Sequence, residues 1–368
     1  MGKSRTETCR ENLRGFCLLH ADPDSGAERP RTGILRKQTE ERRPDTMNNP
    51  AWLLFVLLTI LLWSATSLLY KAGARGKNED HVCLKFSVCV GMVFFVISLA
   101  YLLTREEPFT IWESAVRFWP VTVFGVIYAV VNTISYKGYV YNEATVQSPV
   151  ESISGGTSTL LLIVAFLVLG RVDSVSKLLS PLRFAGILVI MVSVVLLAFV
   201  RNRENRISAE GMKEKWMKRG LGTLVFPLVF AFIDGMETVV TGICLDTSYG
   251  FGMPEGDSII IIGMEYAIFA LGCWIYLYLK EKRIYNPFTK QSAPRILGAV
   301  ADNLGIVFYS YAMAINSVST DPILAAYPVL VMIGGRLIMK EKVSTVQYIL
   351  LFGVIAGSVM VIADTLSF

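Results

Sequence analysis

Histidine, charge and paired cysteines are all scarce in this sequence of 368 residues. Charged residues make up 18% of the chain, whereas a typical soluble domain has about a quarter. The only histidines, His20 and His81, lie outside the apolar runs, so neither a zinc site nor a Ser-His-Asp relay inside such a run has an imidazole. The six cysteines include no CxxC pair, and no GxxxxGKS or GxxxxGKT phosphate loop occurs. We therefore expect no enzyme, no metal, no cofactor and no ATP-driven step.

Hydrophobic residues are abundant instead, at 53% of the chain. They occur in runs of about 20 residues, long enough for an α-helix to cross about 30 Å of hydrocarbon. The sequence thus predicts an all-α integral membrane protein with ten transmembrane helices. The expected spans are 51–70, 82–103, 118–139, 144–169, 181–200, 221–245, 258–279, 295–315, 319–339 and 345–365.

The N-terminal segment 1–46 differs from the rest of the chain. It carries ten Lys/Arg and eight Asp/Glu and has no apolar core, so it is not a secretory signal peptide. Met47 opens MNNPAWLLFVLLTILLW, which resembles an ordinary start of a bacterial membrane protein and points to a prokaryotic cell membrane. The segment is therefore either an untranslated extension or a disordered cytosolic tail. The remainder divides into a first repeat (47–200), a basic link (201–220) and a second repeat (221–368).

The two sets of five spans look related to each other. SYKGYVYNEATVQSP (135–149) aligns with FYSYAMAINSVSTDP (308–322), which places Tyr136 over Tyr309. Because five is odd, the second set enters the membrane in the opposite direction. We expect two inverted five-helix repeats, an arrangement typical of alternating-access carriers with a site near the bilayer midplane.

The segment 321–362 resembles the closing two helices of the EamA-like family in the drug/metabolite transporter superfamily. The residues that carry the resemblance are Pro322, Pro328, Glu341, Gln347, Gly353 and Gly357. The opening segment 53–73, with a Trp-small-polar break before Lys71, also resembles the first helix of that family. One departure is Gly170-Arg171, where the family usually has a glutamate in the first half. The resemblance implies secondary transport of a small metabolite and cytoplasmic termini.

Ionisable residues inside the expected spans are the main candidates for a site. A charged group at mid-depth costs about 3 kcal/mol on insertion scales, so it needs a partner, a proton or water. Asp234 and Glu237 share one face of the sixth span with Thr238 and Thr241. Polar residues recur at helical spacing on the third and fourth spans, so we expect a shared hydrated cavity. The candidates for substrate binding or coupling are Glu151, Asp234, Glu237, Asn132, Gln147, Tyr136, Glu265, Asp302 and Asn303.

Structural roles compete with this interpretation. Serine and threonine in spans often bond only the backbone of their own helix or a neighbour. The central acids could pair with Lys137, Lys85 or Arg336, and Asp302 could lie near the interface because Arg295 is only two turns away.

These features favour a secondary transporter, importing or exporting a small polar metabolite such as an amino acid or amine. Apolar surroundings favour the neutral form of a carboxyl group, so Glu151 or Asp234 could carry a coupling proton. The same acidic excess would suit a cationic substrate that neutralises the site directly. The alternatives are a subunit of a lipid-carrier flippase and a non-transporting scaffold or sensor.

The expected partners are the small-molecule substrate and membrane lipid, without nucleic acid. The GxxxG motif of Gly353 and Gly357 serves either internal helix packing or a homodimer. From residue 47 on, most Lys and Arg lie in the odd-numbered links, which by the positive-inside rule puts both termini outside. The family resemblance implies the opposite orientation, so this point stays open.

Overall fold

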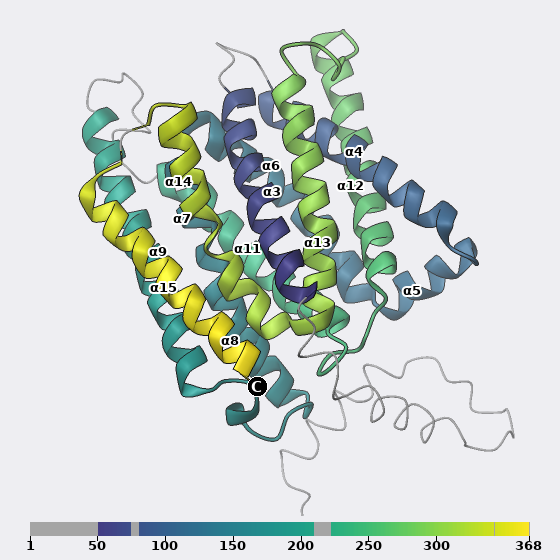
Figure 1. Cartoon of the computed structure of the whole chain (residues 1–368). Coiled ribbons are helices and arrows are strands. Elements are labelled where there is room, and N and C mark those ends of the chain that lie inside the picture. Colours follow the sequence, from purple (N-terminus) through teal and green to yellow (C-terminus); the bar gives the residue numbers. More distant parts are fainter. Residues whose placement is uncertain (1–50, 75–80, 210–221, 342, 368) are drawn as a thin grey trace, which may run out of the picture. The chain divides into compact units, whose positions relative to one another are not determined.

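The computed structural model describes residues 51–74, 81–209, 222–341 and 343–367. The segment 1–46 and most of the link 201–220 lie outside these ranges. Within them the chain is helical and has no strand (Figure 1). The α-helices are α3 (Ala51–Ala74), α4 (Val82–Thr104), α5 (Ile111–Arg117), α6 (Trp119–Tyr141), α7 (Ala144–Glu151), α8 (Ile153–Val168), α9 (Pro181–Ala209), α11 (Gly222–Leu245), α12 (Glu255–Glu281), α13 (Ala293–Leu324), α14 (Tyr327–Ile338) and α15 (Thr345–Ser367); two short 3-10 helices are η1 (Pro108–Thr110) and η2 (Val175–Lys177).

Nine segments of the described residues are long and apolar enough to cross a membrane, which is the pattern of a multi-pass membrane protein. The expected ninth span, 319–339, is not one continuous helix. Its first part belongs to α13, which continues to Leu324 through a break at Asn316, and its second part is the 12-residue helix α14. The expected fourth span is also divided, into α7 and α8, although together they are long enough to cross.

The break at Asn316 has a local chemical cause. Its backbone leaves the helical region at φ −154° and ψ 83°, and its side-chain oxygen accepts the N–H of Ser319 at 3.1 Å. This is the bond that an N-cap residue makes at the start of a new helix. Asp246, just beyond α11, accepts the backbone N–H of Ser317 at 3.2 Å, so a second side chain stabilises the same restart.

Four helix pairs make the most extensive contacts: α3 with α13, α4 with α12, α6 with α11, and α9 with α15. Figure 1 shows α9 and α15 side by side at one edge of the bundle. A Cβ atom added at Gly357 of α15 would lie 2.7 Å from the carbonyl oxygen of Gly186 in α9. The GxxxG motif of α15 is therefore used for packing within the chain, because only glycine permits so close a backbone approach.

Two ion pairs between helices, one of them fully buried, reinforce this packing. Arg183 of α9 binds Asp364 of α15 at 2.9 Å, and both side chains are buried. Lys85 of α4 binds Glu281 of α12 at 2.8 Å. The carboxylate partner of Lys85 is therefore Glu281 and not one of the central acids Glu151, Asp234 and Glu237.

Candidate functional site

A central cavity of about 130 Å³ lies among α3, α6, α7, α8, α11, α12, α13 and α14. This is close to the size of an engineered cavity of about 150 Å³ that binds benzene. Five acidic residues line it: Glu151, Asp234, Glu237, Asp302 and Asp321. Eight aromatic residues line it as well: Trp63, Tyr70, Tyr128, Tyr136, Tyr139, Phe230, Tyr309 and Tyr327. None of the lining residues in the described ranges is Lys, Arg or His.

Glu151 lies at the end of α7 and is bound within the first half of the chain. One carboxyl oxygen accepts hydrogen bonds from the hydroxyl of Ser135 and from the amide of Gln147, the latter at 2.8 Å. The other accepts the phenol O–H of Tyr139 at 3.1 Å. All three donors come from α6 or from α7 itself, so the local fold of these two helices sets the position of this carboxyl group.

Asp234 joins three helices at the side of the cavity. Its carboxyl group, on α11, accepts the O–H of Tyr128 from α6 at 2.8 Å and the O–H of Ser154 from α8 at 2.5 Å. Glu237, one turn further along α11, accepts the hydroxyl of Thr241 at 2.5 Å. The acidic face predicted for the sixth span therefore does point into the cavity.

A second tyrosine–aspartate bond crosses from α13 to α3. Asp302 accepts the O–H of Tyr70 at 2.8 Å, the same length as the bond between Tyr128 and Asp234. The nearby Tyr70 and Tyr136 rings meet edge to face with centroids 5.2 Å apart. Asp302 thus lies in the cavity. The other position that the sequence allows, near the membrane interface, is not the one observed.

Asp321 is an acidic residue of the site that the sequence analysis missed. It accepts the O–H of Tyr309 at 3.3 Å and that of Ser158 at 3.1 Å, and only 4% of its surface is exposed. An uninterrupted ninth span starting at 319 would put Asp321 at the membrane surface. The break at Asn316 and the helix end at Leu324 bring it to the cavity instead. One sequence feature does point to Asp321: it directly precedes Pro322, which aligns with Pro149 of the first repeat.

Six of the nine candidates line the cavity: Glu151, Asp234, Glu237, Asn132, Tyr136 and Asp302. The other three do not. Gln147 lies behind Glu151 as a hydrogen-bond donor. Asn303 is fully buried and donates to the carbonyl of Val90 in α4 at 3.0 Å. Glu265 packs over Gly125 of α6 outside the cavity, where neither carboxyl oxygen has a hydrogen-bond partner among the described residues.

Hydroxyl donors therefore hold every cavity carboxyl group, and within the described ranges none of the five forms an ion pair. A hydroxyl group can orient a carboxylate without neutralising its charge. The described residues also contain no cluster of three or more His, Cys, Asp and Glu that could hold a metal ion. The aromatic rings offer faces that attract a positive charge. The arrangement is suited to protons or to a compact organic cation.

Comparison with known proteins bears on the fold. No protein-family model matches the chain, and no curated protein matches it. Among solved structures, the chain is similar to one described only as "Crystal structure of protein", with a TM-score of 0.54 and 14% sequence identity over 86% of this chain and 98% of the other. At that identity the likeness concerns the fold alone.

Proposed function

We propose that this protein is a secondary transporter that moves a small organic cation, such as an amine, across a membrane by alternating access. The observation that carries the proposal is the central cavity with five carboxyl groups and, within the described chain, no basic lining residue. Charged groups in a membrane are costly and are retained where they serve ions or substrates. A scaffold has no need of such a cavity.

The helix contacts support two inverted repeats. Each helix of the first repeat is matched with its counterpart in the second: α3 with α11, α4 with α12, α6 with the first part of α13, and α9 with α15. The divided span α7–α8 is matched with the last part of α13 together with α14. Under this exchange, the contact of α3 with α13 becomes that of α11 with α6, and the contact of α3 with α14 becomes that of α11 with α8. In the pairs α4–α12 and α9–α15 the two helices simply change places, so each of these contacts corresponds to itself, as a two-fold relation requires.

The breaks in the helices support the same pairing. A proline lies three residues before each second interruption, Pro149 before Ser152 and Pro322 before Ala325. An earlier interruption precedes each of them, at Asn142 in the first half and at Asn316 in the second. We therefore infer ten spans, the ninth made of residues 317–324 and α14. Discontinuous helices around a midplane site are a recurring feature of secondary transporters.

The same features support the resemblance to the EamA-like family, and we propose a prokaryotic plasma membrane as the location. In the family's arrangement the two halves rock about the central site. The driving force is either exchange of protons for the cation at the carboxyl groups or the electrochemical gradient of the cation itself.

Transport in proteoliposomes tests the proposal. Purified protein is reconstituted, and the accumulation of methylammonium, tert-butylammonium and larger amines inside the liposomes is measured, because a one-for-one exchange of protons for a monovalent cation moves no net charge. We expect saturable accumulation of cations that fit the cavity and none of pivalate, an anion of similar size. Two proton gradients of opposite sign distinguish proton exchange from cation uniport. A protein that transports anions, or none of the cations above empty liposomes, would contradict the proposal.

A further inference from the structure

The connection between α4 and α6 exposes an apolar face that the cavity does not explain. It consists of η1 and α5, and its exposed side chains include Phe109 at 92%, Trp112 at 75% and Val116 at 61%. These three residues are spaced i, i+3 and i+7, so they fall on one side of a helical segment. Such large apolar groups are rarely left in water in a contiguous row.

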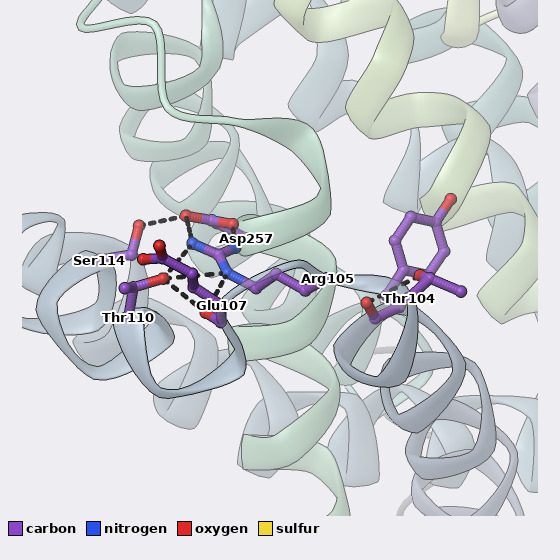
Figure 2. A network of polar contacts seen from close by, with 7 residues as sticks. Thr104, Arg105, Glu107, Thr110, Ser114 and Asp257 are labelled. Carbon is purple, nitrogen blue, oxygen red and sulfur yellow. Dashed lines mark hydrogen bonds and ion pairs between the residues drawn. The ribbon is translucent and has the colours of Figure 1, made fainter.

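The opposite side of this segment is fastened to the body of the protein. Figure 2 shows Ser114 and Arg105 converging on the carboxyl group of Asp257, in the first turn of α12. Ser114 donates to Asp257 at 2.5 Å, the Arg105 guanidinium binds the same carboxylate, and it also bonds Thr110 at 3.0 Å. Asp257 is only 3% exposed. The segment is thus held in one rotational setting, with its apolar face away from α12.

The segment also lies where the hydrocarbon ends. The span α4 ends at Thr104 and the span α6 begins at Trp119, so the residues between them lie at one membrane boundary. Figure 1 shows α5 there, at the ends of α4 and α12. Apolar side chains near the adjoining ends of the two spans are exposed as well, Leu103 at 76% and Val123 at 44%. Trp is favoured at this depth because its ring is amphipathic, and Phe is typical of the apolar face of helices that lie in the interface.

We propose that residues 108–119 form an in-plane membrane anchor that inserts Phe109, Trp112 and Val116 into the interface of the lipid leaflet. The exposed charges of the connection are three glutamates, Glu106, Glu107 and Glu113, against Arg117, since Arg105 is paired with Asp257. An acidic rim of this kind fits a zwitterionic lipid surface and not an anionic one, which attracts basic segments. Through Asp257, the anchor fixes the start of α12 at the membrane surface.

Tryptophan quenching tests this proposal in bilayers. The full chain and its Trp112→Phe variant are reconstituted in phosphatidylcholine with or without bromine on the acyl chains, and the Trp112 emission is obtained as the difference between their spectra. We expect this difference to be quenched by brominated lipid and little affected by aqueous iodide. The matched control is Trp52→Phe, because Trp52 is 2% exposed and the emission lost there should respond to neither quencher.

Each other outcome overturns the proposal. Quenching of the Trp112 emission by iodide alone would place the face in water. Protection from both quenchers would mean that protein covers it, for example a second copy of the chain. A lipid series tests the charge argument, since replacing part of the phosphatidylcholine by phosphatidylglycerol should leave bromolipid quenching equal or weaker. Stronger quenching in the anionic bilayer would contradict the zwitterionic preference. None of these readouts depends on transport.

Discussion

The two broken regions of the chain hold their carboxyl groups in different ways. In the first half, Glu151 takes all of its hydrogen bonds from α6 and α7, through Ser135, Tyr139 and Gln147. In the second half, Asp321 takes one bond from Tyr309 of its own helix and one from Ser158 of α8, which belongs to the first half. The carboxyl group of Glu151 is thus held by residues of its own half only, whereas that of Asp321 is held by residues of both halves.

This difference bears on how an alternating-access cycle would proceed. If the halves rock as rigid bodies, the bonds of Glu151 move with the first half and stay intact. The bond between Ser158 and Asp321 spans the moving seam, so it has to break or shift. We infer that Glu151 acts chiefly in binding and that Asp321 acts chiefly in the exchange between conformations.

The largest effect is expected from removing the charge of Glu151. Glu151→Gln keeps the shape of the side chain but loses a carboxylate that a cation needs. A hydrogen bond to a charged group is worth about 1.5–3 kcal/mol, so cation affinity should fall about 10- to 150-fold, as measured by uptake against substrate concentration in proteoliposomes. Asp173→Asn, at an exposed position in the connection after α8, should leave affinity unchanged. Unaltered affinity in Glu151→Gln would remove Glu151 from the site.

A steric change at the seam should come next in size. A Cβ atom at Gly155 of α8 would lie 2.7 Å from the backbone oxygen of Asp321, so Gly155→Ala must push the two halves apart. Overpacking of this kind costs about 1–3 kcal/mol, and the thermal midpoint in detergent should fall. Gly272→Ala is the matched control, because nothing lies within 4 Å of an added Cβ there. Equal midpoints for the two variants would show that α8 and α13 are not in close contact.

Removal of single hydroxyl groups should have a smaller effect on transport kinetics and tests the difference between Glu151 and Asp321. Ser135→Ala removes a donor to Glu151, and Ser158→Ala removes the donor that reaches Asp321 across the seam. Each carboxyl group keeps its other hydrogen-bond donors, so the net loss is about 1 kcal/mol. Ser135→Ala should change the half-saturating substrate concentration by about fivefold with little change in maximal rate. Ser158→Ala should change the maximal rate instead. The same kinetic change in both variants would abolish the distinction between the two regions.

The sequence predicts much of the fold because apolar runs of span length and polar links leave few other arrangements. It also locates Glu151, Asp234 and Glu237, because a mid-span carboxyl group needs a wet or bonded environment. It does not distinguish Asp302 from its neighbour Asn303, since only the packing of α13 decides which of them faces the cavity. The sequence does not locate Asp321 for another reason. Its depth in the membrane depends on a helix break, and hydropathy alone does not reveal such breaks.

Binding of a charge series to the purified protein tests the central claim most directly. tert-Butylammonium, tert-butanol and pivalate share a compact alkyl frame and carry charges of +1, 0 and −1. Calorimetric titration should show saturable binding of tert-butylammonium, weaker binding in Glu151→Gln, and no binding of tert-butanol or pivalate, because five carboxyl groups and no basic residue of the described chain line the cavity. Equal binding of the alcohol, or preferential binding of pivalate, would contradict a cation site.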